Sequence, residues 1–226
     1  YPSVMLSEKF PMSKPIKVDL RKENFEELVK NDDVGLMFDI KIKGLHSKLT
    51  YESYLSESKC FSQKNAVVNN GRIYQADEII TTITDIDYRI IKQCYSWESI
   101  EIANCYKFYM QYLPKSILES ILKLYQDKTT LKDVKGFEVE YLLSKGMLNS
   151  VYGMTVTDIV RELIEYNEGW NIEKPSKEEI EKQIETYNNS TNRFLYYPWG
   201  VWVTAYARLN LWSGILNVCE DYVYSD

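Results

Sequence analysis

The chain has 226 residues, a length that suits one large domain or two small ones with ample material for a core. Hydrophobic residues make up 45% and charged residues 27% of it, as in ordinary soluble globular proteins. The formal net charge is −6, which excludes a surface coated with cations for indiscriminate DNA binding. Any phosphate-binding site must therefore be local.

The histidine and cysteine contents exclude further kinds of site. The single histidine, His46, excludes a histidine-based catalytic triad and a multi-histidine metal centre, and its neighbours predict a loop. The four cysteines show no C-x-x-C spacing and no signal peptide is recognisable, which indicates reduced thiols in the cytosol. No apolar run reaches transmembrane length, so we expect no contact with a membrane.

The first half of the chain alternates strands and helices. Residues 34–43 place apolar side chains at every second position, which predicts a strand with one buried face. Residues 66–74 contain Asn70-Gly71 between two strand-like pieces, a hairpin signal. A helix is predicted over 84–95, capped by Thr84 or Asp85, and a strand over 98–109.

After Pro114 the pattern becomes helical. Apolar residues at helical spacing from 115 to 126, a lysine-rich link and a second helix around 144–153 predict a helical hairpin. The charged segment 154–193 contains one predicted helix, 176–188. A long apolar helix is expected from 198 to about 219, and the residues from 221 resemble a strand cut short.

Three polar residues share one face of the second helix of this hairpin. Lys145, Asn149 and Tyr152 lie at positions i, i+4 and i+7. The apolar residues between them point elsewhere and can be buried: Met147, Leu148 and Val151. The face offers a cation, an amide and a ring along about 10 Å. It could hold a nucleoside triphosphate, with the cation on phosphate and the ring on sugar or base. Surface helices also display such residues by chance.

The string "KGMLNSVYG", 145–153, strongly resembles motif B of family-B DNA polymerases, K-x-x-x-N-S-x-Y-G. Tyr1-Pro2 resembles the end of their motif A, S-L-Y-P. Residues 203–208, "VTAYAR", resemble the T-x-x-A-R motif of the protein-primed bacteriophage type. The final "YSD", 224–226, resembles the first half of motif C, Y-x-D-T-D-S. Four motifs in the family's order cover the chain from its first residue to its last.

The resemblance implies a site for an incoming deoxynucleotide. Lys145 would bind its triphosphate, Tyr1 would stack under its sugar and exclude a 2′-hydroxyl, and Tyr152 would lie in the pocket of the nascent base pair. Asn149 would support that pocket. Lys128 is similar to a second phosphate-binding lysine of the family, although its distance of 17 residues from Lys145 is longer than the family pattern.

The resemblance also implies contacts with a DNA primer–template. Thr204 and Arg208 would hold the primer end, Arg208 through a backbone phosphate. Where the family carries a basic residue one turn before Lys145, this chain has Tyr141. Two alternatives stay open: Lys132 or Lys135 supplies the missing charge, or the site is less positive than in the family.

The implied reaction is attack of a primer 3′-hydroxyl on the nucleotide α-phosphorus, with two Mg²⁺ ions held by aspartates. Asp226 matches the first aspartate of motif C and would be the catalytic and metal-binding carboxylate. The motif A aspartate would precede Tyr1, and the second motif C aspartate would follow Asp226. Because one carboxylate cannot hold two dications, we expect the chain by itself not to polymerise.

The expected fold class is α+β, a polymerase palm of antiparallel strands packed on helices, with a projecting helical-hairpin fingers subdomain. Strands 34–43 and 221–225 should pack on helices 84–95 and 198–219, and Tyr1 should lie near Asp226. The expected domains are a first palm part with an insertion, the fingers, an insertion between motifs B and C, and a second palm part, at residues 1–114, 115–153, 154–197 and 198–226.

In protein-primed relatives the insertions contact a terminal protein and wrap DNA. The acidic, helix-forming composition of 154–193 departs from a hairpin-like insertion, so strand displacement is not implied. The partners implied are DNA primer–template, dNTP and a terminal protein primer, in phage or plasmid replication in the cytoplasm of a bacterial host. Two alternatives stay open: a module that binds nucleotide or nucleic acid without turnover, and a helical interaction protein.

Overall fold

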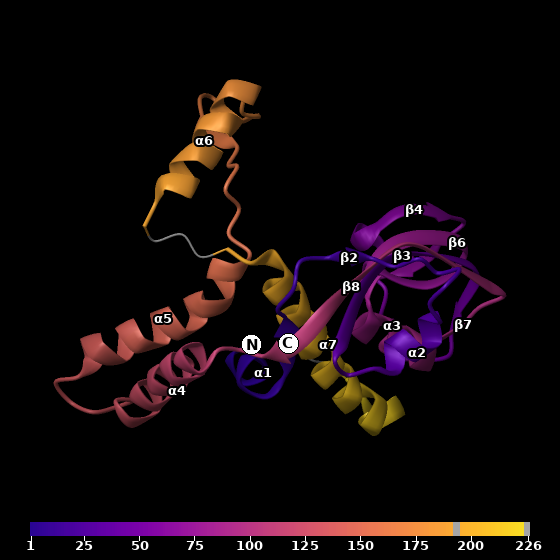
Figure 1. The fold of residues 1–226 in the computed structure, drawn as a ribbon, viewed down its shortest axis with the longest axis horizontal. Helices are drawn as coiled ribbons and strands as arrows, with labels where there is room; N and C mark the ends of the chain where they lie inside the picture. Colours follow the sequence, from indigo (N-terminus) through magenta and orange to yellow (C-terminus); the bar gives the residue numbers. More distant parts are fainter. Residues whose placement is uncertain (192–194, 224–226) are drawn as a thin grey trace. The chain divides into compact units, whose positions relative to one another are not determined.

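The computed structural model describes residues 1–191 and 195–223. The chain divides into two compact units. The first combines Tyr1–Leu122 with the segment from Val201 onward, and the second is Lys123–Gly200 (Figure 1). The long helices α4 (Lys115–Thr130) and α7 (Tyr197–Val218) each cross from one unit into the other.

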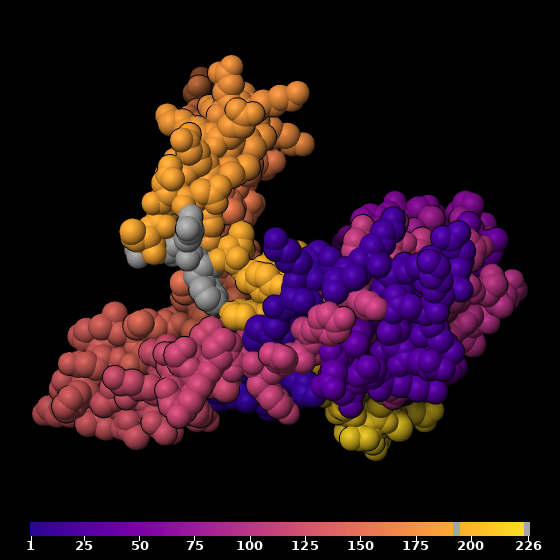
Figure 2. Space-filling view, in the orientation of Figure 1, coloured from indigo at the N-terminus to yellow at the C-terminus, as the bar shows by residue number. Residues whose placement is uncertain are grey.

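An antiparallel sheet forms the first unit. Its main strands follow the order β1-β8-β3-β6-β4, with bounds Lys9–Pro11, Ser99–Tyr112, Val34–Ser47, Arg72–Thr84 and Cys60–Lys64. Three short strands extend its edges: β2 (Ile16–Lys17), β5 (Val67–Asn69) and β7 (Tyr95–Ser96). The predicted antiparallel sheet is therefore present, and Figure 2 shows the atoms of this unit in space-filling form, coloured mainly indigo to magenta.

The central strand β3 confirms the strand predicted over 34–43 and extends it to Ser47. Phe38, Ile40 and Ile42 are buried, whereas Lys41 between them is only partly covered, which is the alternation expected when one face of a strand meets the core. The extension carries His46 into the strand, so the predicted loop at that residue is wrong. The His46 ring packs edge-on against Tyr74 with centroids 5.2 Å apart.

The predicted hairpin at 66–74 is confirmed as the turn between β5 and β6. Asn69 pairs with Arg72, so Asn70 and Gly71 alone form the turn. Both have positive φ, 46° and 72°, which is the conformation that a two-residue hairpin turn requires. The strand β6 that follows runs on to Thr84, well beyond the predicted end.

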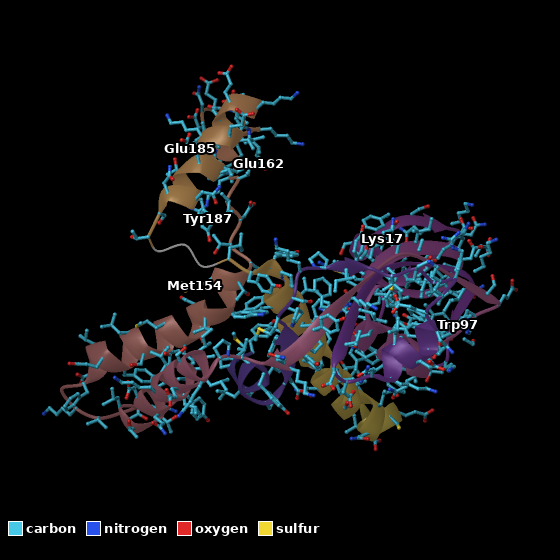
Figure 3. All side chains as sticks on the ribbon, in the orientation of Figure 1. Lys17, Trp97, Met154, Glu162, Glu185 and Tyr187 are labelled. Atoms are coloured by element: carbon cyan, nitrogen blue, oxygen red, sulfur yellow. The ribbon has the colours of Figure 1, made fainter. Side chains whose placement is uncertain are left out.

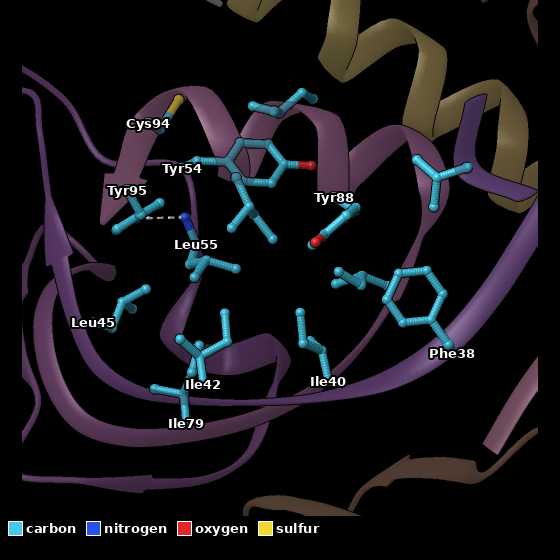
Figure 4. Close-up of a cluster of buried hydrophobic side chains, with 14 of the residues drawn as sticks. Phe38, Ile40, Ile42, Leu45, Tyr54, Leu55, Ile79, Tyr88, Cys94 and Tyr95 are labelled. Carbon is cyan, nitrogen blue, oxygen red and sulfur yellow. Dashed lines mark hydrogen bonds between the residues drawn. The ribbon is translucent and has the colours of Figure 1, made fainter. Parts of the chain in front are cut away.

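Helix α3 (Asp85–Cys94) confirms the predicted helix over 84–95. Thr84 is the N-cap and forms a capping box with Asp87, each side chain accepting a hydrogen bond from the other residue's backbone N–H. Its apolar face joins the buried side chains of β3 and β6 in the main core, where Tyr88 lies near Phe38 (Figure 4). Shorter helices complete the unit: α1 (Pro2–Ser7), α2 (Phe25–Lys30), η1 (Glu57–Lys59) and η2 (Cys219–Asp221).

Helix α7 confirms the helix predicted from 198 to about 219. Trp202 is fully buried and packs edge-on against Phe108 of β8, with ring centroids 5.2 Å apart. Trp212 and Ile215 belong to the main core. The expectation that strand 34–43 packs with helices 84–95 and 198–219 therefore holds for the part of α7 that lies in this unit.

The second unit contains two predicted features and one that was missed. Helix α5 (Glu138–Thr155) follows α4 as the predicted helical hairpin, and α6 (Lys177–Asn189) confirms the helix over 176–188 (Figure 1). Between them β9 (Leu163–Tyr166) and β10 (Trp170–Glu173) form an antiparallel hairpin. The inference that this segment departs from a hairpin-like insertion is therefore wrong in its structural part.

The hairpin could not be predicted from the sequence because its strands have no buried face. Every residue of both strands is exposed, including Tyr166 and Trp170, whose rings meet edge-on at 5.3 Å. Acidic side chains are exposed around the hairpin as well, such as Glu162 directly before β9 and Glu185 on α6 (Figure 3). The period-2 signal that reveals a half-buried strand is therefore absent.

Two expectations concern the end of the chain. A strand was expected over 221–225, but Asp221 belongs to η2 and residues 222–223 have no strand structure, while 224–226 lie outside the described residues. The expected proximity of Tyr1 and Asp226 also falls outside them. Within the described part of the chain, no helix is both long and apolar enough to cross a membrane.

Candidate functional site

The candidate nucleotide-binding residues lie on α5. This helix begins after a turn at Gly136, whose φ of +90° suits glycine. Backbone hydrogen bonds lower the pKa of the Glu138 carboxyl, first the bond from its own N–H and then the bond from the N–H of Gly136. An acidic residue in the first turn also suits the positive end of the helix dipole.

Lys145, Asn149 and Tyr152 all lie within the regular part of α5 and therefore share one face, as their spacing predicts. Lys145 and Asn149 are exposed, and Tyr152 is half-buried. Leu148 is buried as expected, but Met147 is 57% exposed, so its predicted burial is wrong. Met147 lies on the opposite side of the helix from Lys145, and more than half of its surface is open to solvent.

Tyr141 lies one turn before Lys145 and contacts it. The Lys145 ammonium Nζ lies 5.9 Å from the centroid of the Tyr141 ring, within the range of a cation–π interaction. The tyrosine that stands where the family carries a basic residue therefore holds the lysine side chain over its ring. Tyr141 and Lys135 both line a hollow of about 520 Å³ at the turn before α5.

Lys128 lies in the last turn of α4 and is half-buried. A cation at this position stabilises the negative end of the helix dipole, which is a sufficient structural reason for it. It belongs to the same unit as Lys145.

Tyr1, Thr204 and Arg208 belong to the first unit. Tyr1 is the N-cap of α1 and is 54% exposed, while Pro2 occupies the first position of that helix, where its missing N–H costs nothing. Thr204 and Arg208 lie four residues apart on α7 and are both half-buried. The Thr204 hydroxyl donates to the Val201 carbonyl oxygen at 2.8 Å.

Arg208 is held by two side chains distant in sequence. Its Nε and Nη2 donate to Oδ1 of Asp87 at 2.9 and 2.8 Å, and Nε also donates to the Tyr54 hydroxyl at 3.0 Å. Tyr54 in turn donates to Oδ1 of Asp87. Arg208 therefore links α7 to α3 and to the segment before η1.

The charges of this cluster reinforce one another. Burial by itself would lower the pKa of the Arg208 guanidinium, but the Asp87 charge and the hydrogen bonds outweigh it, so that pKa lies above its usual value. Burial, followed by the Asp87 charge, raises the pKa of the Tyr54 phenol far above its usual range. Tyr54 therefore stays protonated and donates to Asp87 at every physiological pH.

Sequence reasoning missed Asp87 and Tyr54. Asp87 was visible as part of a helix start, but nothing local connects it with Arg208, which lies 121 residues further along the chain. A signal did exist, since Arg208 precedes Trp212 by one turn and Ile215 by two, on the apolar side of α7. An arginine on a buried face needs an anionic partner.

Among residues 1–191 and 195–223 there is no group of three or more histidine, cysteine, aspartate or glutamate side chains that could hold a metal ion. Asp226, the carboxylate expected to bind Mg²⁺, lies outside the described residues. The described part of the chain therefore does not by itself fit a two-metal centre.

The fold was compared with known proteins. No protein-family model matches the sequence, and no curated protein matches it. Solved structures do: phi29 DNA polymerase complexed with primer–template DNA has a TM-score of 0.64 and 20% sequence identity, over 95% of this chain and 33% of that chain. An orthorhombic crystal form of the same polymerase has a TM-score of 0.63 and 19% identity, over 100% of this chain and 36% of that chain.

A third structure, phi29 DNA polymerase with primer–template DNA and incoming nucleotide, has a TM-score of 0.59 and 20% identity, over 95% of this chain and 34% of that chain. The chain thus spans about a third of the length of these polymerases. It has the mixed helix and antiparallel-sheet fold of that part, as the resemblance predicted.

Proposed function

We propose that the chain is the nucleotide- and primer-binding part of a DNA polymerase of the protein-primed bacteriophage type. The observation that carries the proposal is the joint occurrence of two facts. The motif B residues Lys145, Asn149 and Tyr152 share one face of α5, and the chain has the fold of a part of phi29 DNA polymerase from end to end. Either fact by itself would leave an ordinary surface helix as the simpler explanation.

Lys145 is the proposed ligand of the nucleotide triphosphate. Its ammonium is exposed and supplies a point charge that can follow a phosphate as it moves. Asn149, one turn further, and the half-buried ring of Tyr152 are proposed to support the base-pair pocket. Lys128 is a second proposed phosphate ligand, and Tyr1 is proposed to stack under the sugar and to exclude a 2′-hydroxyl.

Thr204 and Arg208 are the proposed contacts to the primer end. They lie one turn apart on α7, so a hydroxyl and a guanidinium follow one another along the helix at about 6 Å. This spacing suits neighbouring phosphates of one strand, and such contacts position a protein without reading sequence. To donate to a phosphate, the Thr204 hydroxyl must give up its hydrogen bond to the Val201 carbonyl oxygen. In the solved relatives the DNA is a primer–template or a single strand.

The chemistry proposed for the intact enzyme is deoxynucleotide transfer to a primer 3′-hydroxyl, with Asp226 among the ligands of two Mg²⁺ ions. The described residues assemble no metal centre, so the role proposed for them is binding and positioning. We propose that this chain binds nucleotide and primer but does not extend the primer by itself, in the cytoplasm of a bacterial host.

The segment 154–197 is proposed to contact a terminal protein primer. Its β9–β10 hairpin exposes apolar side chains, among them Ile164, Tyr166, Trp170 and Ile172. Exposed apolar groups of this density mark a surface that another molecule covers. The segment carries more acidic than basic residues, which favours protein over a DNA backbone as that molecule.

Nucleotide titration tests the proposal. Fluorescent dATP is titrated into the chain with a primer–template and Mg²⁺ present, for wild type, Lys145→Ala and Lys123→Ala. Lys123 is the matched control, since it is an exposed lysine of the same unit, on α4. Lys145→Ala removes a charged group that donates hydrogen bonds to the triphosphate, so it should weaken dATP binding by about 10-fold or more. Equal affinities for all three proteins would refute the assignment of Lys145.

A further inference from the structure

The Asp87 carboxylate has no capacity left for another ligand. Oδ2 accepts hydrogen bonds from the backbone N–H and the hydroxyl of Thr84, at 3.1 and 2.9 Å. Oδ1 accepts from Tyr54 and from Nε and Nη2 of Arg208. Five donors thus surround a carboxylate whose side chain is only 8% exposed. The group is fixed in position by the first turn of α3 and has no exposed lone pair for a metal ion or a substrate.

The Arg208 guanidinium, in contrast, is only partly used. An arginine has five N–H donors in a planar fork. Within the described part of the chain its hydrogen bonds use Nε and Nη2, and Nη1 has no partner. The side chain is 40% exposed, so the unused edge can reach a ligand from solvent. Guanidinium edges of this kind bind phosphate oxygens in two-point fashion.

Tyr54 is itself held firmly. It is 6% exposed, its ring packs edge-on against Trp212 at 5.4 Å, and its carbonyl oxygen accepts from Nη1 of Arg72 at 3.1 Å. The hydroxyl therefore has one available orientation, between Asp87 and Arg208. Together Asp87 and Tyr54 fix two of the three nitrogens of the guanidinium.

We propose that Asp87 and Tyr54 are positioning residues for Arg208, which they hold so that its Nη1 edge is presented to a phosphate of the primer strand. The inference rests on the proposed function, since it concerns the primer contact assigned to Arg208. It adds two residues, 121 and 154 positions from Arg208 in the sequence, to the machinery that holds the primer end.

Stability alone is a weak reason for the cluster. Burying an ion pair costs desolvation that its attraction often fails to exceed, and apolar replacements of similar volume are frequently as stable. Trp212 and Ile215 already attach this side of α7 to the core. An ion pair that leaves one nitrogen of the cation without a partner is better explained by a third, anionic group that binds there.

The test compares two DNA ligands. Anisotropy titrations of the full chain use a duplex with a recessed 3′ primer end and a blunt duplex of equal length. All titrations are made at a temperature at which circular dichroism shows that every variant is folded. The variants are Arg208→Gln, Asp87→Asn and Tyr54→Phe. Asp85→Asn and Tyr88→Phe are matched controls, because they change the same groups on α3 without contact to Arg208.

A positioning role for Asp87 predicts the direction in which Asp87→Asn changes the affinity for DNA. Asp87→Asn removes a negative charge, so on charge alone it would tighten DNA binding, as its control Asp85→Asn would. Loss of orientation should instead weaken binding to the recessed end by about 5- to 10-fold and leave the blunt duplex unchanged. Tyr54→Phe changes no charge and should weaken the recessed end by about 3-fold. Neither change should add to the loss in an Arg208→Gln background.

Two failures can be distinguished. If Arg208→Gln does not weaken binding to the recessed end, or wild type binds neither duplex, the primer contact of the proposed function is wrong and the inference falls with it. If Arg208→Gln weakens it but Asp87→Asn and Tyr54→Phe behave like their controls, the function stands and the inference is overturned. A lowered melting temperature with unchanged preference for the recessed end assigns the cluster to stability and also overturns it.

Discussion

Gly35 of β3 lies directly against the indole of Trp202 on α7. A Cβ built on Gly35 would lie 2.8 Å from Cζ2 of Trp202 and 2.6 Å from the sulfur of Met110, distances that real Cβ atoms do not adopt. Trp202 is fully buried, and its Nε1 has no hydrogen-bond partner among the described residues. Close packing of Trp202 against Gly35, rather than a hydrogen bond of its indole, therefore fixes the position of α7 on the sheet.

Gly35→Ala should destabilise the first unit. The added methyl group must displace Met110 or Trp202 in a packed core, which costs about 1–3 kcal/mol. Gly214→Ala is the control on α7, where a new Cβ meets nothing within 4 Å and alanine favours the helix by up to about 1 kcal/mol. Thermal unfolding should show opposite shifts for the two variants. Equal shifts would contradict the packing described.

The turn between β5 and β6 should depend on the residue at Gly71. Its φ of +72° is left-handed, and nothing lies within 4 Å of a Cβ there, so backbone conformation alone decides the cost. Gly71→Ala should lower the free energy of unfolding by about 1–2 kcal/mol, and Gly71→Asn by less, because asparagine tolerates this conformation. Chemical denaturation measures both. A larger loss for asparagine than for alanine would contradict the turn geometry.

Asp85 should make stability depend on pH. Its carboxylate is buried and accepts a hydrogen bond from the Leu36 backbone N–H at 3.0 Å, and burial raises its pKa to about 6. The folded protein therefore binds this proton more tightly than the unfolded chain does. The contribution of Asp85 to stability is consequently greatest below about pH 4, declines as pH rises to about 6, and is unfavourable above that.

Asp85→Asn should reveal this contribution, since the amide keeps the shape and the acceptor without the charge. At pH 7 the variant should gain up to about 3 kcal/mol relative to wild type, and the gain should vanish near pH 4. Denaturant unfolding at both values measures it, with the exposed Asp221→Asn as control. A gain that grows as pH falls would contradict the assignment.

Tyr141 should affect nucleotide binding through Lys145. A cation–π interaction at an exposed site contributes about 0.5–1 kcal/mol, and it restricts the lysine to one region. Tyr141→Leu should weaken dATP binding by about 2- to 5-fold, whereas Tyr141→Lys, which restores the basic residue of the family, should strengthen it. The titration described for Lys145 measures both. Identical affinities for both variants would show that the ring and the charge at this position do not matter.

Local patterns were sufficient to predict most elements. The alternation from Val34, the Asn70-Gly71 pair, the Thr84 cap and the spacing of Lys145, Asn149 and Tyr152 each act over a few residues, and the structure reproduces them. The motif strings carried the resemblance to the polymerase fold. That likeness could not have come from periodicity, because the same patterns occur in unrelated α+β proteins.

What the sequence could not predict depends on tertiary contacts or on missing burial. The pairing of Asp87 with Arg208 joins helices 121 residues apart, and no local signal encodes it. The β9–β10 hairpin lacks the buried face that reveals a strand, and Met147 is apolar yet exposed. Exposed apolar groups of this kind indicate an interaction surface, because folding of the unit does not explain them.

If the proposed function is right, this chain binds a nucleotide opposite a DNA template. The most direct measurement is the affinity of the four dNTPs for the complex of the chain with a primer–template whose first unpaired base is dT. We expect dATP to bind more tightly than the other three, and Lys145→Ala to weaken the binding of all four. Equal affinities for the four nucleotides, or a preference for dATP that persists when the templating base is changed, would contradict it.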